Sequence, residues 1–237
     1  MKKTSRAKPV GFDKRRAERL VSALKAEKSF EAGIARVSGL FLGRPYVENP
    51  LGGGPRSPER FRISFDEFDC VTYVEIVIAL ARSKTPAAVV RELRGLRYRD
   101  GKVDWSRRNH YMIEWLARNR SRGAVKDLTR GRDTVVKTRE LDIVAGFPAT
   151  RVTFRLFPKR AFSRIRKRIR TGDLILFVST RKNLDMFHAG IAVRLDDRVL
   201  LRHAARSAGK VIEQDLGTFL KEHRMPGFIL ARPLCQP

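Results

Sequence analysis

The chain has 237 residues, 42% of them apolar, which is enough to bury a core and excludes an intrinsically disordered protein. Its two cysteines, Cys70 and Cys235, are too few for a domain held together by disulfides. Lysine and arginine total 51 against 25 aspartate and glutamate, and the formal net charge of +26 indicates attraction to an anionic partner.

The N-terminal part is basic and has the pattern of helices. Residues 12–28 and 30–42 place apolar side chains at helical intervals among paired charges, and we expect two helices outside the core. The first residues contain no apolar run typical of a signal peptide, and no stretch of about 18 apolar residues would span a membrane. We therefore expect the periplasm or cell envelope if a signal peptide is missing from this sequence, and the cytoplasm otherwise. The expected parts are a basic helical segment at 1–28 and one domain at 29–234.

A loop rich in glycine and proline, at 43–58, leads to the first motif of chemical interest. We expect a buried helix to begin near Cys70, with Asp69 as its N-cap, because apolar residues recur at helical spacing at Val74, Val77, Ile78 and Ala81. In the first turn, free backbone N–H groups and the helix dipole favour the thiolate of Cys70, which is its nucleophilic form. The alternative is a small, buried structural cysteine.

Two further helices follow. One opens with a Thr-Pro pair and covers about 86–96. Another is expected at about 107–120, where Arg107 and His110 lie one turn apart and would hold a substrate carboxylate or a sugar oxygen. The alternative for this pair is a helix cap and a surface charge.

The segment from Arg151 to Arg170 is the most basic part of the chain, with nine basic residues and no acidic ones. Phe162, Ile165 and Ile169 fall on one helical face, so we expect an amphipathic helix that packs on a sheet. Its basic outer face would contact an anionic polymer, lipopolysaccharide phosphate or nucleic acid, although no base-reading motif accompanies it.

The C-terminal half is predicted to form a mainly antiparallel sheet and one short helix at about 216–223. His188 shares a strand face with Gly190, whose missing side chain leaves space beside the imidazole, and the adjacent strand would bring His203 to His188. Each histidine alone is also consistent with a structural role. The expected strands lie near 150–157, 173–179, 187–194, 198–204, 209–213 and 227–232.

A cysteine at a helix start, followed by histidines on later strands, is typical of a nucleophile with its base. No cofactor is expected. The sequence has no Cys-x-x-Cys or His-x-x-x-His pair, which argues against a structural zinc site. A single metal ion held by Cys70, His188 and His203 stays an alternative.

The order of these motifs resembles a known family. Asp-Cys at a helix start, then Gly-Asp-Leu-Ile, His-Ala-Gly-Ile and a final His-Ala resemble the NlpC-type cell-wall hydrolases, which are papain-like. The resemblance implies an α+β, papain-like fold in which the nucleophile helix packs on a mainly antiparallel sheet, with extra N-terminal helices. Longer segments resemble the N-acetylmuramoyl-L-alanine amidase-like branch of that family, at 41–47, 51–54, 68–75, 97–101 and 106–115.

What the branch implies is a cysteine hydrolase that cuts the amide between N-acetylmuramic acid and L-alanine in peptidoglycan fragments, including 1,6-anhydro muropeptides. Cys70 would attack the carbonyl, His188 would act as base and acid, and His203 would orient His188. Relatives use a tyrosine upstream of the cysteine at the oxyanion, which makes Tyr46 a candidate beside the backbone N–H of Cys70.

Two other interpretations are open. The chain would be a D-glutamyl endopeptidase of the stem peptide if the site accepted peptide on both sides of the cleaved bond. It would be a non-catalytic basic protein if it only bound an anionic polymer or nucleic acid. In each case we expect a monomer.

Overall fold

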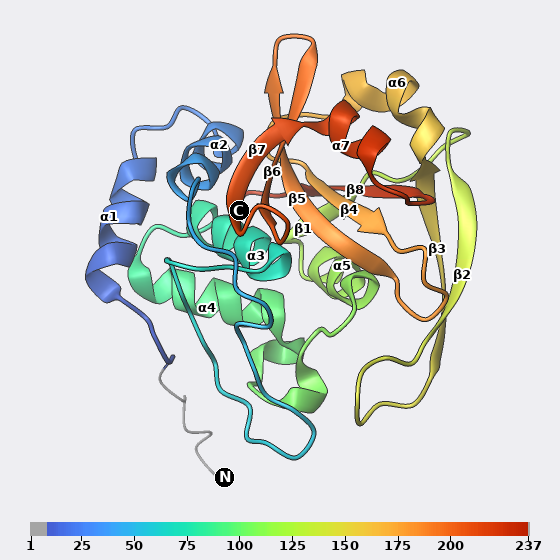
Figure 1. The fold of residues 1–237 in the computed structure, drawn as a ribbon. Helices are drawn as coiled ribbons and strands as arrows, with labels where there is room; N and C mark the ends of the chain where they lie inside the picture. The colour runs from blue at the N-terminus through green and yellow to red at the C-terminus, as the bar shows by residue number, and fades with distance from the viewer. Residues whose placement is uncertain (1–8, 237) are drawn as a thin grey trace.

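The computed structural model describes residues 9–236. These residues form an antiparallel sheet with helices on both of its faces (Figure 1). The eight strands follow the order β2-β3-β8-β4-β5-β6-β7, and β1 pairs with β8. Every strand pair in this sheet is antiparallel. The predicted α+β class with a mainly antiparallel sheet is confirmed.

The elements have the following bounds. The helices are α1 (Lys14–Leu24), α2 (Phe30–Leu40), α3 (Cys70–Ala81), α4 (Pro86–Arg97), α5 (Met112–Ser121), α6 (Phe162–Ile165) and α7 (Leu216–Glu222). The strands are β1 (Val125–Asp127), β2 (Val135–Leu141), β3 (Thr150–Pro158), β4 (Leu174–Val178), β5 (Met186–Leu195), β6 (Arg198–Ala205), β7 (Lys210–Asp215) and β8 (Gly227–Pro233).

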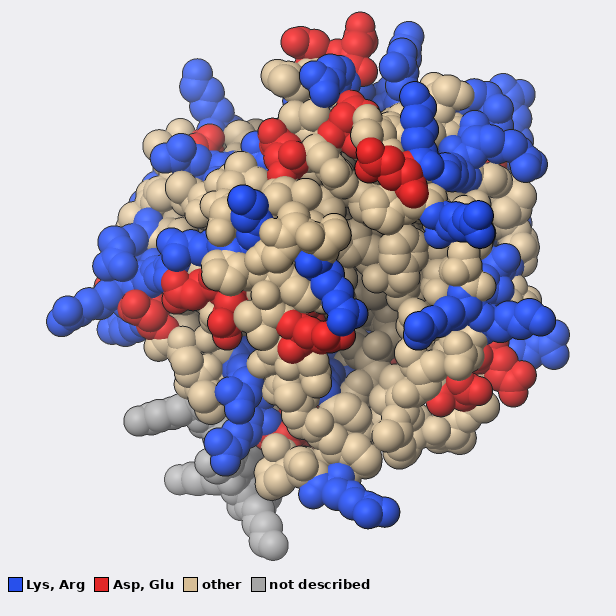
Figure 2. Space-filling model, viewed as in Figure 1, with Lys and Arg blue, Asp and Glu red and all other residues tan. Residues whose placement is uncertain are grey.

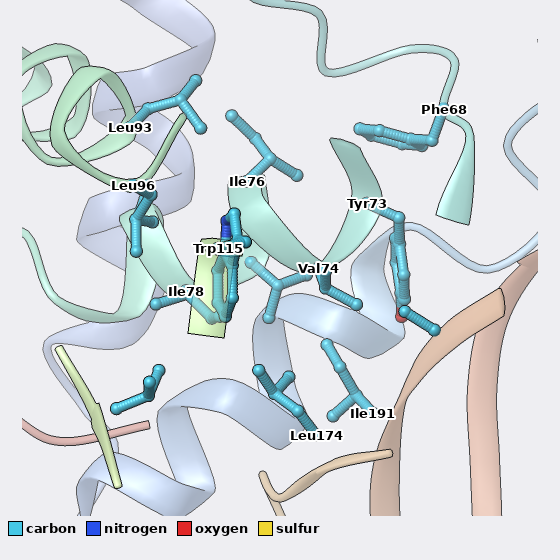
Figure 3. Close-up of a cluster of buried hydrophobic side chains, with 14 of the residues drawn as sticks. Phe68, Tyr73, Val74, Ile76, Ile78, Leu93, Leu96, Trp115, Leu174 and Ile191 are labelled. Atoms are coloured by element: carbon cyan, nitrogen blue, oxygen red, sulfur yellow. The ribbon is translucent and has the colours of Figure 1, made fainter. Parts of the chain in front are cut away.

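Helix α3 is apolar on nearly all sides because it lies in the middle of the main core. Figure 3 shows its side chains between Leu93 and Leu96 of α4 and Leu174 and Ile191 of the sheet. A second apolar cluster lies on the other face of the sheet, under α6 and α7. Burying each large apolar side chain contributes about 1.5–3 kcal/mol, so α3 is held firmly in place.

The N-terminal helices are more closely integrated than expected. Asp13 and Ser29 cap α1 and α2, each accepting a hydrogen bond from a backbone N–H in the first turn. Both helices lie at the edge of the molecule, yet each inserts buried residues into the main core, at Ala17, Val21, Ile34 and Val37. The expectation that they pack outside the core was therefore wrong. The division at residue 28 stays a prediction, and residues 1–8 of that segment lie outside the described part.

The predicted helix at 107–120 begins five residues late, at Met112. Arg107 instead ends a 3-10 turn that Asp104 caps by accepting a hydrogen bond from the Ser106 N–H. The following residues stay extended because Asn109 donates its backbone N–H to the Arg97 carbonyl, 2.9 Å away. A local cap and a long-range backbone bond thus outweigh the helical pattern.

The basic segment at 151–170 is only partly helical. Its first half is strand β3, in which Phe154 and Leu156 are buried and the residues between them are exposed. Helix α6 is a single turn between two 3-10 turns. Phe162, Ile165 and Ile169 do pack on the second core cluster, so the predicted burial of that face is confirmed and the long helix is wrong. Strands β1 and β2 were not predicted, because β1 is short and β2 is largely exposed.

Candidate active site

Cys70 is the first residue of α3, as predicted. The Asp69 carboxylate accepts a hydrogen bond from the Thr72 backbone N–H at 2.7 Å, and the Thr72 hydroxyl accepts one from the Asp69 N–H at 3.0 Å. This reciprocal capping box fixes the start of the helix. Cys70, which is half-buried, is thereby held at the N-terminal end of α3.

The thiol lies against strand β5, beyond the end of the β5–β6 ladder. Among residues 9–236, the paired residues of β5 and β6 run from Leu195↔Arg198 to Ile191↔Arg202. The backbone N–H of Ala189, beyond that ladder, donates to the thiol of Cys70. Ala189 directly follows His188 in the chain, so the cysteine lies against the strand that carries His188.

The side chains of His188 on β5 and His203 on β6 meet. Nε2 of His188 lies 2.7 Å from Nδ1 of His203, within hydrogen-bonding distance. Gly190 makes this possible because a side chain there would place its Cβ 3.1 Å from the Cβ of His203 and 2.6 Å from the Leu201 side chain. The predicted juxtaposition of the two histidines is confirmed, and Gly190 provides the expected space beside them.

A third histidine and a phenylalanine complete the surroundings of this pair. The Phe219 ring of α7 lies 5.7 Å from the imidazole of His188, 5.4 Å from that of His203 and 4.1 Å from that of His223. Nδ1 of His223 is hydrogen-bonded to the Phe219 carbonyl at 3.0 Å. Sequence analysis missed both residues, although their spacing of one helical turn on a helix next to the histidine strands was a usable signal.

The ionisation of the site is set by its burial. Burial lowers the pKa of His188 to about 3 and that of His203 to about 4, and His223 acts in the same direction on both. Burial also raises the pKa of the Cys70 thiol to about 12, and the Asp69 carboxylate adds to this. The resting site therefore holds neutral imidazoles and a neutral thiol near neutral pH.

The expectation of a resident thiolate is wrong for this resting site. The backbone N–H groups at the helix start, those of Cys70 and Val71, do lower the pKa of the thiol, as does that of Ala189. These contributions are smaller than the penalty for burying the charged form and the repulsion from Asp69. A proton acceptor is therefore needed when the thiol reacts.

Tyr46 lies close to the cysteine although 24 positions separate them in the chain. Its backbone pairs with Phe68, and its N–H donates to the Gly209 carbonyl at 2.8 Å. Burial raises the pKa of its phenol, and Cys70 and Asp69 are the next causes. The structure thus brings this candidate to the cysteine.

Arg107 and His110 do not form the pair that was expected, because neither lies on an α-helix. The Arg107 guanidinium is 3.0 Å from the Asp100 carboxylate. Nε2 of His110 lies 2.8 Å from the Trp105 carbonyl, and its ring packs between Trp105 at 4.3 Å and Phe147 at 4.9 Å. The two side chains therefore have separate partners.

The loop at 43–58 connects Tyr46 to the aromatic cluster of Trp105, His110 and Phe147. At Gly53, φ is 84° and an added Cβ would lie 3.5 Å from the Trp105 ring. At Gly146, φ is 86° and an added Cβ would lie 2.8 Å from Pro55. Both glycines permit close packing of the loop. Figure 2 shows a hollow near the centre of this face, with a mainly tan floor and charged side chains on its rim.

The described residues contain neither a metal-binding group of side chains nor a membrane-spanning helix. Within residues 9–236, no three His, Cys, Asp or Glu side chains are grouped so that they would hold a metal ion. Over the same range, none of the helices combines the length and the apolar character needed to cross a bilayer.

Comparison with solved structures shows the same fold in proteins from two bacteria. A Legionella pneumophila protein described by the family model DUF1460 superposes with a TM-score of 0.81 at 22% identity, covering 94% of this chain and 96% of that chain. An N-acetylmuramoyl-L-alanine amidase from Bacteroides uniformis has a TM-score of 0.75 at 25% identity, covering 86% and 98%. Another structure with that description and source has a TM-score of 0.76 at 24% identity, covering 86% and 99%.

No curated protein matches the chain significantly in sequence. The family model described as AmiA-like, N-acetylmuramoyl-L-alanine amidase-like, matches residues 36–228. This match covers the capping box, the cysteine, all three clustered histidines and the sheet. The chain therefore belongs to the N-acetylmuramoyl-L-alanine amidase-like family.

Proposed function

We propose that this protein is a cysteine-dependent amidase that hydrolyses the N-acetylmuramoyl-L-alanine bond of peptidoglycan fragments, including 1,6-anhydro muropeptides. The family match supports the substrate class. The observations that support the chemistry are the hydrogen bond to the Cys70 thiol from the Ala189 N–H, one residue after His188, and the paired imidazoles of His188 and His203. We interpret this arrangement as the NlpC-type, papain-like one.

In the proposed mechanism, Cys70 and His188 react from their neutral forms. As the thiol sulfur bonds to the amide carbonyl carbon, its proton passes to His188. His188 then gives this proton to the leaving amine as the C–N bond breaks, and a thioester remains. A water molecule, deprotonated by His188, hydrolyses the thioester and restores the thiol.

His203 would set the tautomer of His188. If Nε2 of His188 donates to Nδ1 of His203, the other ring nitrogen of His188 has no proton and can act as the base. His203 then carries its own proton on Nε2, a buried atom with no hydrogen-bond partner among the described residues. We therefore assign His203 the role of a positioning residue.

The oxyanion would form near the start of α3. The backbone N–H of Cys70 is one proposed donor, and the Tyr46 hydroxyl is the second because burial keeps it protonated beside the cysteine. Loss of one such donor costs about 2.7–4 kcal/mol of transition-state stabilisation.

We propose that the sugar side of the substrate lies toward the aromatic cluster of Trp105, His110 and Phe147. The loop at 43–58 joins this cluster to the cysteine, and aromatic rings with adjacent polar groups are common in ligand sites. Arg107 lies two residues after Trp105 in the chain and would contact a sugar oxygen or carboxylate after leaving Asp100.

The products of digestion test the bond assignment. Purified protein is incubated with defined muropeptides, with and without the 1,6-anhydro sugar, and products are identified by mass spectrometry. We expect an intact peptide that begins with L-alanine, and lower rates for Arg107→Ala and His110→Ala, with Lys28→Ala, at an exposed site, as a control. Free L-alanyl-D-glutamate would show endopeptidase activity instead, and no product with retained binding would show a non-catalytic protein.

A second test concerns His203. His203→Asn should retain part of the activity because an amide can still bond to His188, whereas His203→Ala should lose more. His203 is one cause of the lowered pKa of His188, so both variants should raise that pKa. The acidic limb of the pH profile of kcat/KM should therefore move to higher pH. Equal activity of both variants and wild type, with an unmoved limb, would leave His203 a purely structural residue.

A further inference from the structure

A pocket of about 740 Å³ lies between α6, α7 and the start of β6, on the side of the sheet opposite α3. Its volume is in the range of small-ligand sites, about 300–1,000 Å³. In Figure 2, lysine and arginine side chains gather at the upper right, over the position of α6 in Figure 1. The pocket thus opens on the most basic segment of the chain, which the proposed amidase chemistry does not use.

The walls of the pocket are apolar. The Phe162 ring is only partly buried and lines the cavity together with Val199 and Leu220, and Pro158 and Pro226 add further apolar surface. Gly217 faces the same ring, and an added Cβ there would lie 3.4 Å from it. An apolar chain entering this space would be removed from water on several sides.

The rim of the pocket is cationic. Arg160, Arg166 and Lys221 line it, and in the described range 9–236 none of the three forms an ion pair. Of the two carboxylates in the lining, Asp215 is committed to capping α7, accepting from the Thr218 N–H at 2.9 Å. The other, Asp197, is exposed, and five basic side chains line the pocket against these two carboxylates. The rim therefore keeps a net positive charge directly beside an apolar cavity.

We propose that this pocket takes an acyl chain of an anionic lipid, with the lipid phosphate on Arg160, Arg166 and Lys221, and so docks the protein on an anionic membrane surface. The combination of charge and apolar depth selects this ligand. Free phosphate would leave the cavity unfilled, and nucleic acid would need stacking platforms, whereas Phe162 is the one aromatic ring in the lining. One buried chain binds weakly by itself, so the basic rim supplies the second attraction that stable docking needs.

Vesicle co-sedimentation tests the proposal without any hydrolysis assay, so it stands apart from the proposed function. The full chain is mixed with vesicles of phosphatidylcholine, and with vesicles in which about one third of the lipid is phosphatidylglycerol. We expect binding only to the second kind. Exchange of chloride for inorganic phosphate at constant ionic strength should leave vesicle binding unchanged, because the lipid acyl chain in the pocket contributes to vesicle binding.

Two variants locate the site. Arg160→Glu/Arg166→Glu should lower the vesicle affinity by about tenfold or more, since each basic residue near the surface contributes separately. The control Arg91→Glu/Arg120→Glu makes the same charge change at exposed residues of α4 and α5, and should lower it by about twofold or less. Phe162→Ser should weaken binding with the charge unchanged, and thermal unfolding checks that each variant is folded.

Several results would overturn the proposal. Equal losses in the two charge-reversed pairs would mean diffuse electrostatic adsorption. Unchanged vesicle binding by Phe162→Ser would mean that no acyl chain enters the pocket. Loss of vesicle binding in inorganic phosphate would mean that the rim recognises phosphate alone. Binding to a single-stranded oligonucleotide, but not to vesicles, would assign this surface to nucleic acid.

Discussion

Cys70→Ala is expected to abolish the hydrolysis of muropeptides, and so is His188→Ala. Nucleophile and base act as one unit in the proposed mechanism, so each loss should lower kcat/KM by about a thousandfold or more. The double variant should be no less active than either single one. Rates are measured from the release of peptide, followed by mass spectrometry, and circular dichroism shows whether the fold is retained.

The chain provides its own control for the thiol. Cys235 is exposed near the C-terminus, so Cys235→Ser removes the other cysteine and should keep full activity. Substantial turnover by Cys70→Ala would contradict the cysteine mechanism. If Cys70→Ala were inactive but His188→Ala kept its rate, the thiol would have a different base.

Arg97→Ala is expected to cause the largest loss of stability. The Glu75 carboxylate of α3 is only 2% exposed and accepts hydrogen bonds from the Arg97 guanidinium at 2.8 Å and from the Trp115 indole at 3.1 Å. Removing the arginine leaves a buried carboxylate without its counter-charge, which costs about 3–5 kcal/mol. Urea unfolding at neutral pH measures the free energy of unfolding.

Two comparisons separate the lost charge pair from lost volume. Glu75→Gln/Arg97→Met removes both charges and keeps similar size, so it should recover most of the stability lost by Arg97→Ala. Lys14→Ala breaks an exposed pair with Glu18 and should change the free energy of unfolding by about 0.5 kcal/mol or less. A small effect of Arg97→Ala, similar to that of Lys14→Ala, would show that water or a rearranged side chain compensates Glu75.

The sequence alone determined the features that depend on local pattern. The start of α3 was predictable because Asp69 and Thr72 lie at the spacing of a capping box and the following residues have helical apolar periodicity. The strand of His188 was predictable from its short apolar run, and adjacency of consecutive strands then brought His203 to it. Local signals failed at 107–111, where a backbone bond to Arg97 kept the chain extended.

The surroundings of these residues depend on how distant segments pack together. Tyr46 reaches Cys70 through a contact between segments far apart in the chain, on which single-sequence periodicity contains no information. The helical spacing of Phe219 and His223 is visible in the sequence, but their packing beside the histidine pair follows from the position of α7 on the sheet. The protonation state of Cys70 also could not be predicted from the sequence. The helix terminus favours a thiolate, but burial, which exists only once the sheet and helices have packed, favours the neutral thiol more strongly.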